Sequence, residues 1–302
     1  MMKRIISVSL GSSRRNHKTI QQFAGQTFSI ERIGTDGDKQ KAIELIRLLD
    51  GQVDAFGLGG TDLYIYAGNR RYTFRESAQI AAAAQKTPIV DGSGVKNTLE
   101  RRVVRFLEEN EVYRFQGKRV LIVCAVDRFG LAEALVNAGS SVVFGDLLFG
   151  LGLPLPIRSL DGLARLAKVV APVITQLPVS FFYPTGDRQL SSRPRFSRYF
   201  TEADVVAGDF HFIRRYMPPS LAGKIVITNT ITGEDEALLR ERGVATLVTT
   251  TPDMGGRSFG TNVLEGVAVA LAGKRPEELT AADYDRILNE MGIQPTVKRL
   301  NP

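Results

Sequence analysis

Lys96 and Asp91 lie in one glycine-containing segment, Asp91–Thr98, that precedes an expected helix. Glycines and a lysine at a helix N-terminus favour the binding of a carboxylate or phosphate. The two side chains could also form an acid–base pair across a hydroxyl or carbonyl group, provided that burial and mutual charge adjust their pKa values. The alternative is a glycine turn with a helix cap. The substrate-binding candidates of this segment are Ser93 and Asn97.

A second candidate is the turn Ala125–Gly130, which follows an expected strand, Lys118–Cys124. In a dinucleotide-binding βαβ unit, the pyrophosphate lies on the N-terminus of the helix after this turn. When Gly130 is aligned with the third glycine of G-x-G-x-x-G, Ala125 and Asp127 take the first two glycine positions. Asp127 brings a side chain and a negative charge to the place where backbone approaches the pyrophosphate, which argues against ordinary docking.

Asp146 ends the next expected strand, about twenty residues after the turn, where an acidic side chain binds the ribose hydroxyls of adenosine. The alternative reading makes Asp127 a helix N-cap and Asp146 a solvated strand end. The cofactor-binding candidates, for NAD, are Ala125, Asp127, Arg128, Phe129, Gly130, Asp146, Thr228 and Asn229.

Polar loops follow several other expected strands, and in an open α/β sheet the carboxyl ends of the strands converge on one ligand-binding crevice. Residues of these types also form turns for purely structural reasons. The loops are Gly11–Asn16, Gly59–Asp62, Asp209–His211, Thr228–Thr230 and Thr250–Asp253. From them we select Ser12, Arg14 and Asp62 as substrate-binding candidates and His211 as a catalytic candidate.

A third glycine-rich segment, Gly255–Asn262, leads into an expected helix and carries Arg257. Backbone donors and an arginine make it a further candidate anion site, with Arg257 as a substrate-binding residue. Its glycines could equally well provide a hinge or allow the helix to pack closely against the sheet.

Composition limits the class of protein. The 302 residues are 43% hydrophobic and 24% charged, which indicates a globular chain with room for two domains. The net charge of +7 is spread over scattered arginine pairs, so a small anionic metabolite is a better partner than nucleic acid, for which no motif is present. The single cysteine, Cys124, allows neither an internal disulfide nor a zinc cluster, and we expect no metal. We also expect no membrane segment and a cytoplasmic location.

Strand and helix patterns alternate along the whole chain, which predicts an α/β protein of two α/β domains. We expect residues 1–115 to form an N-terminal substrate domain, whose last helix, Asn97–Asn110, opens with a capping box of Asn97 and Glu100. Its other expected elements are the strands Ile5–Leu10, Phe28–Ile33, Val53–Leu58 and Pro88–Val90 and the helices Asp38–Leu49 and Ser77–Gln85, with a hairpin over Tyr64–Phe74 that turns at Gly68-Asn69.

We expect residues 116–302 to form a Rossmann-like domain with a doubly wound parallel sheet. Its expected strands include Lys118–Cys124, Ser141–Gly145, Asp204–Gly208, Lys224–Thr228 and Ala245–Thr250. Its last helices, Asn262–Leu271 and Ala281–Met291, carry capping boxes at Asn262/Glu265 and Thr280/Asp283. Whether they pack back on the first domain or form a homodimer is left open by the sequence.

The sequence resembles bacterial proteins labelled quinate 5-dehydrogenase. The similar stretches are Ile33–Asp38, Asp62–Tyr72, Ala125–Gly130, Gly208–Ile213 and Arg257–Val263. The label implies a relationship to the shikimate/quinate dehydrogenases, in which an N-terminal substrate domain precedes a nucleotide-binding domain and a lysine–aspartate pair transfers the proton. The glycine-rich dinucleotide turn of that family is absent here.

These observations lead to one main hypothesis and two alternatives. The main one is an NAD(H)-linked dehydrogenase of a small polyhydroxylated carboxylic acid, bound in the interdomain cleft, with Lys96 and Asp91 in proton transfer and arginines neutralising the carboxylate. The first alternative is a non-redox enzyme acting on a nucleotide or phosphorylated metabolite. The second is a two-lobed, non-catalytic protein that senses a metabolite.

Overall fold

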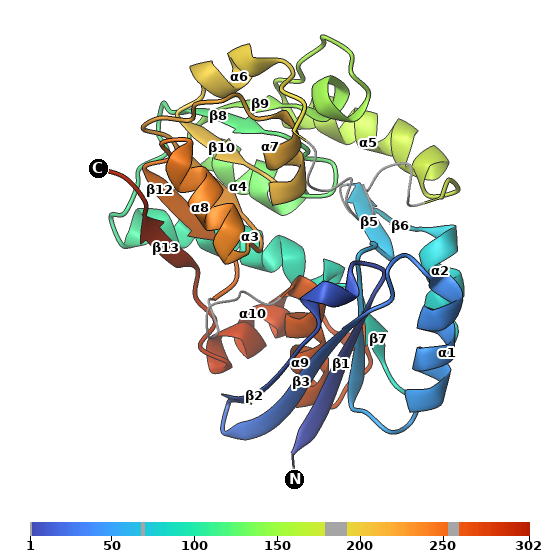
Figure 1. Ribbon diagram of the computed structural model, residues 1–302. Helices are drawn as coiled ribbons and strands as arrows, with labels where there is room; N and C mark the ends of the chain where they lie inside the picture. The colour runs from blue at the N-terminus through green and yellow to red at the C-terminus, as the bar shows by residue number, and fades with distance from the viewer. Residues whose placement is uncertain (1, 68–69, 179–191, 253–259) are drawn as a thin grey trace.

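The computed structural model describes residues 2–67, 70–178, 192–252 and 260–302. Their strands form two large sheets and one short hairpin. The two sheets lie in separate lobes, with the N-terminus in the lower lobe of Figure 1. This arrangement confirms the expected fold class, two α/β units of which the second is Rossmann-like.

The first sheet has the strand order β2-β3-β1-β4-β7, and only β2 runs antiparallel to its neighbour. Its strands are β1 (Lys3–Ser9), β2 (His17–Phe23), β3 (Gln26–Gly34), β4 (Ala55–Gly59) and β7 (Ile89–Val90). Among the parallel strands the order reverses between β1 and β4. Ligands of open α/β sheets bind at such a switch point.

Helices cover both faces of this sheet. Because successive side chains of a strand alternate between faces, Ile6 and Val8 pack toward α1 (Lys39–Leu49) and α2 (Arg75–Ala81), whereas Ile5 packs toward α9 (Thr261–Ala272). Helix α9 belongs to the last part of the chain, yet it contacts β1 and β4. α10 (Ala281–Glu290) follows it and contacts α3 (Ser93–Glu109).

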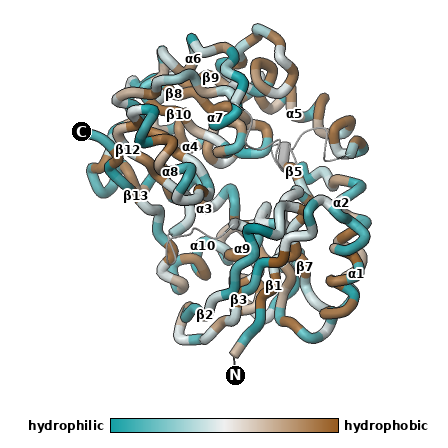
Figure 2. Tube along the Cα trace, in the orientation of Figure 1, coloured by the Kyte–Doolittle hydropathy of each residue, from teal (hydrophilic) through white to brown (hydrophobic). Residues whose placement is uncertain are grey.

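The second sheet has the order β13-β12-β11-β10-β8-β9, and only β13 is antiparallel. Its strands are β8 (Arg119–Ile122), β9 (Ser141–Phe144), β10 (Val205–Ala207), β11 (Ile225–Thr228), β12 (Thr246–Thr249) and β13 (Thr296–Arg299). The order of the parallel strands is that of a doubly wound sheet, with its switch point between β8 and β10. The central strands of both sheets are hydrophobic (Figure 2).

Two hydrophobic clusters hold the helices of the second lobe against this sheet. One contains residues of α3, α4 (Phe129–Asn137) and α5 (Leu160–Ile174). The other contains residues of α6 (Ser197–Glu202), α7 (Phe210–Tyr216) and α8 (Gly233–Glu241), with the π-helical turn η2 (Asp146–Gly150).

Two elements connect the cores of the two lobes. Helix α3 places Val95 in the core of the first lobe and Val103 in that of the second. The hairpin of β5 (Tyr64–Ala67) and β6 (Arg70–Thr73), which is antiparallel as expected, contributes Ile65 to the second core. Its expected turn, Gly68-Asn69, lies outside the described residues.

Two expected capping boxes are wrong. Helix α3 begins one turn earlier than expected, because Gly92 is its N-cap with a left-handed backbone (φ 97°), and Asn97 lies inside the helix. Helix α9 begins after Gly260, so Asn262 is no cap either. The third box, in which Thr280 and Asp283 cap α10, is confirmed.

Among the described residues, no helix is both long and apolar enough to span a membrane.

Candidate functional site

A cleft of about 250 Å³ lies between the two lobes. Its lining comes from the carboxyl ends of β1 and β4 in the first sheet and of β10 and β11 in the second. Four of the five predicted loops, at Gly11, Gly59–Asp62, Asp209–His211 and Asn229–Thr230, therefore meet at one place, whereas Thr250, Thr251 and Pro252 of the fifth do not line it.

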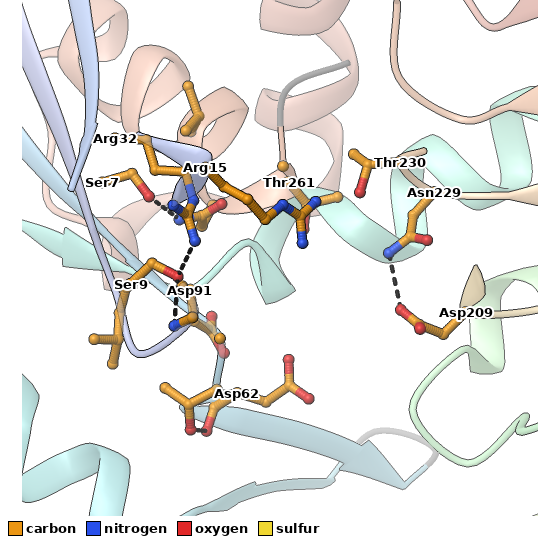
Figure 3. A pocket seen from close by; sticks show the side chains of 18 of the residues that line it. Ser7, Ser9, Arg15, Arg32, Asp62, Asp91, Asp209, Asn229, Thr230 and Thr261 are labelled. Atoms are coloured by element: carbon orange, nitrogen blue, oxygen red, sulfur yellow. Dashed lines mark hydrogen bonds between the residues drawn. The ribbon is translucent and has the colours of Figure 1, made fainter. Parts of the chain in front are cut away.

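The first wall of the cleft carries two arginines. Arg32 of β3 donates through Nη2 to Ser9 Oγ (2.9 Å) and through Nη1 to the carbonyl oxygen of Ser12 (3.1 Å), so its guanidinium is held in place. Arg15, from the short helix η1 (Ser13–Arg15), lines the same cleft. Figure 3 shows both side chains on one side of the pocket. This wall is suited to a carboxylate.

The floor of the cleft, beside the first wall, depends on close backbone packing. Ser7 and Ser9 project from the same face of β1, toward α9, and the Asn262 amide donates to Ser7 Oγ at 2.8 Å. A Cβ at Gly57 would lie 2.9 Å from the Asn262 carbonyl oxygen, so β4 needs glycine here. The contact fixes the N-terminal turn of α9 beside the cleft.

The opposite wall is built around Asp209, the N-cap of α7. Its Oδ1 accepts a hydrogen bond from the His211 amide (2.8 Å), and its Oδ2 accepts from Asn229 Nδ2 (3.0 Å) and Arg128 Nη2 (3.2 Å). Burial acts to raise the pKa of Asp209, but His211 and Arg128 outweigh it and hold the pKa below its ordinary value. A carboxylate is therefore fixed in the cleft wall.

Lys96 and Asp91 do not form the expected pair. Lys96 Nζ lies 2.8 Å from Asp127 Oδ2, and although burial opposes it, Asp127 raises the pKa of this lysine. Asp91 accepts hydrogen bonds from the backbone amides of Leu63 (2.6 Å), Tyr64 (3.0 Å) and Ser93 (3.0 Å). Asp91 lines the cleft and Lys96 does not; Lys96 faces a much smaller pocket beside Asp62.

The turn Ala125–Gly130 is filled by the chain's own carboxylate. Asp146 Oδ1 accepts hydrogen bonds from the amides of Ala125 (2.9 Å) and Val126 (2.8 Å). Asp146 is buried, and this burial raises its pKa to about 6. It is therefore neither a solvated strand end nor presented to a ribose, and both sequence interpretations of Asp146 are wrong.

The N-terminus of α4, where a pyrophosphate would bind, is covered by α3. The amide of Gly130 donates to Asn97 Oδ1 (3.0 Å) and that of Leu131 to Glu100 Oε2 (3.3 Å). A Cβ on Gly130 would lie 2.7 Å from the Asn97 carbonyl oxygen. The glycine therefore allows α3, and not a ligand, to pack closely against this turn. Together with Asp127 at the second glycine position, these contacts do not fit NAD at this turn.

The other predicted residues are divided between several places. Asn229 and His211 line the cleft, and Thr228 is buried and donates to the Asn229 side-chain oxygen (3.1 Å). Ser12 caps η1, and Arg14 is exposed. The small pocket is lined by Lys96 together with Ser93, Asn97, Asp127 and Phe129. Asp62 borders both pockets. Arg257 lies outside the described residues.

Sequence reasoning missed Ser7, Ser9, Arg15, Arg32 and Asp209 as individual site residues. A usable signal was present for two of them, since Ser7 and Ser9 are polar residues two apart in an otherwise apolar strand. No such signal was present for Arg32, because a charged residue within an expected strand is also typical of an exposed edge strand. The described residues contain no group of His, Cys, Asp and Glu that could hold a metal ion.

Comparison with protein families gives two matches. Residues 94–300 match the family described as "Domain of unknown function (DUF8754)", and residues 4–91 match "Domain of unknown function (DUF8753)". No curated protein matches the sequence.

Some solved structures show remote similarity. Hetero-hexameric glutamate dehydrogenase from Thermus thermophilus has a TM-score of 0.44 at 15% identity, over 96% of this chain and 74% of that one. NAD-dependent malic enzyme from Thermotoga maritima has a TM-score of 0.37 at 12% identity, over 97% of this chain and 85% of that one. A sugar ABC transport substrate-binding protein from Bordetella parapertussis has a TM-score of 0.35 at 13% identity, over 98% of this chain and 89% of that one. Values this low say nothing about the ligand or activity of this chain.

Proposed function

The chain belongs to the DUF8754 family, and we propose that it binds a small polyhydroxylated carboxylic acid, of the quinate or shikimate type, in the cleft between its two lobes. The observation that carries this proposal is the polarity of the cleft. Arg15 and Arg32 stand on one wall, and Asp209 and Asn229 stand on the other (Figure 3). A ligand with a carboxylate at one end and hydroxyl groups at the other matches both walls.

The size of the cleft agrees with a compact ligand. Its volume of about 250 Å³ lies just below the roughly 300–1,000 Å³ typical of pockets for drug-sized molecules. A one-ring acid suits this volume better than a dinucleotide. The cleft also lies at the β1/β4 switch point of the first sheet, where open α/β sheets bind ligands, and at the carboxyl ends of β10 and β11 in the second sheet.

An NAD(H)-linked dehydrogenase acting on the same acid is a second candidate. In its support, Asp91 and His211, two of the three expected catalytic residues, line the cleft. Because the turn Ala125–Gly130 does not fit the pyrophosphate, we derive no reaction step through NAD. Binding of the acid alone, as in a metabolite sensor, needs no cofactor and agrees best with the geometry.

Calorimetric titration of the purified protein tests the proposal. The probes are quinate, the neutral polyol myo-inositol, NAD, NADP, ATP and S-adenosylmethionine. We expect binding of quinate that is clearly tighter than that of myo-inositol, because only the acid can use the arginine wall. Equal affinity for the two would contradict the role of the arginines. Binding of NAD would restore the dehydrogenase, and binding of ATP alone would favour a nucleotide ligand over the acid.

A further inference from the structure

Asp209 and Asn229 lie next to each other in the second wall of the cleft. They follow the neighbouring strands β10 and β11, and Asp209 Oδ2 is 3.0 Å from Asn229 Nδ2. Thr228 donates to the Asn229 side-chain oxygen at 3.1 Å, which fixes the orientation of the amide. The pair therefore presents a carboxylate and an amide N–H group side by side, in set positions.

Arg128 supports this pair from behind. It is only 3% exposed, and its guanidinium bridges Glu100 (2.8 Å), which is buried in α3, and Asp209 (3.2 Å). A buried carboxylate keeps its charge when such a partner is present. The bridge thus holds Asp209 ionised at the cleft while Arg128 itself does not line the cleft.

The two side chains retain hydrogen-bonding capacity. The oxygens of Asp209 accept three hydrogen bonds from the described residues, those of Arg128, Asn229 and the His211 amide, whereas a carboxylate offers about four acceptor sites. The Asn229 amide has two N–H groups, and one of them is directed to Asp209. Within the described part of the chain, one acceptor site on Asp209 Oδ1 and one N–H group of Asn229 therefore remain.

We propose that Asp209 and Asn229 form a subsite for two adjacent hydroxyl groups, a vicinal diol, of the ligand in the cleft. The carboxylate accepts a hydrogen bond from one hydroxyl, and the amide donates to the oxygen of the next. This subsite rests on the proposed function and refines it. The ligand carries its carboxylate toward Arg15 and Arg32 and its diol toward the second lobe, so it bridges both lobes.

Two probes and three variants test the subsite by calorimetry. Quinate has ring hydroxyls and a carboxylate, and cyclohexanecarboxylate has the carboxylate alone. Asp209→Asn keeps the size of the side chain and its ability to cap α7 but removes the charge. The matched control is Asp204→Asn, at the opposite end of β10, where the side chain accepts from the Arg119 amide.

We expect Asp209→Asn to weaken quinate binding by roughly tenfold to a hundredfold, the loss of a charge-assisted hydrogen bond. It should leave cyclohexanecarboxylate binding unchanged, and Asp204→Asn should leave both unchanged. Asn229→Ala should repeat the selective loss, with circular dichroism confirming that each variant is folded.

The other outcomes separate the two proposals. If Asp209→Asn and Asn229→Ala leave quinate binding intact, the diol subsite is wrong and the carboxylate cleft stands. If both variants weaken the two acids equally, Asp209 acts on the structure of the cleft and the subsite is again wrong. If the wild-type protein binds neither acid, the proposed function fails and the subsite fails with it.

Discussion

The Lys96 ammonium lies 2.8 Å from the Asp127 carboxylate, and this ion pair joins helix α3 to the turn after β8. Asp127 stands where a dinucleotide-binding turn has its second glycine. Burial disfavours the charge of Asp127, but Lys96 and Arg128 outweigh it and hold its pKa below the ordinary value. Asp127, whose charge makes pyrophosphate binding at this turn unfavourable, thus forms an ion pair with Lys96 within the folded chain.

The first prediction concerns the stability of this pair. Lys96→Met should lower the free energy of unfolding by about 3–5 kcal/mol, because it leaves Asp127 largely buried without its counter-charge. Adding Asp127→Leu should restore much of the loss, since no unpaired charge then remains. Urea denaturation measures both, with the exposed Lys168→Met as control. A Lys96→Met variant as stable as this control would show that the pair contributes nothing.

The second prediction concerns Asp146 in the turn after β8. Asp146→Ala should cost about 1–3 kcal/mol, because two buried amides lose their acceptor, whereas Asp146→Asn keeps an acceptor oxygen and should cost less. The protein's affinity for quinate should not change in either variant, since Asp146 does not line the cleft. Denaturation and calorimetry on the same samples test this. Weaker ligand binding at unchanged stability would return Asp146 to the binding site.

The third prediction is a pH dependence caused by Glu265. This carboxyl group is 4% exposed, and burial, with the nearby Asp91, raises its pKa from 4.5 to about 8. Between these two values the folded chain keeps a proton that the unfolded chain releases, so this group's contribution to stability falls as the pH rises, by up to about 1.4 kcal/mol per pH unit.

Glu265→Gln tests this dependence. Glutamine keeps an acceptor for the Gly92 amide, which Glu265 binds at 2.7 Å, and it cannot ionise. The variant should therefore gain stability relative to the wild type between pH 5 and pH 8, as urea denaturation across that range would measure. A constant difference between the two proteins would show that Glu265 does not hold the extra proton.

The fourth prediction concerns the floor of the cleft. Gly57→Ala should cost about 1–3 kcal/mol through overpacking, because the new methyl group would lie 2.9 Å from the Asn262 backbone. It should also weaken quinate binding, since the displaced turn of α9 borders the cleft. Gly233→Ala is the matched control, with nothing within 4 Å of the added atom. Thermal unfolding of both variants measures the stability difference, and equal stability would contradict the close contact.

The sequence predicted the alternating architecture and the convergence of the strand-end loops because both follow from local periodicity and from the geometry of parallel sheets. It could not predict the partners of individual charges. The spacing of Asn97 and Glu100 is that of a capping box, but Gly92 starts the helix a turn earlier, and both side chains reach α4 instead. The buried position of Asp146 is another example. Its hydrogen-bond donors are the amides of Ala125 and Val126, which lie beside it only in the folded chain.

The central claim is that a carboxylic acid binds against the arginines of the cleft. Calorimetric titration of quinate into Arg15→Met and Arg14→Met tests it most directly, because the two residues are neighbours and only Arg15 lines the cleft. The account predicts that Arg15→Met weakens binding by roughly tenfold or more, the size of a lost charge-assisted interaction, while Arg14→Met binds like the wild type. Equal affinities of the two variants for quinate would contradict it.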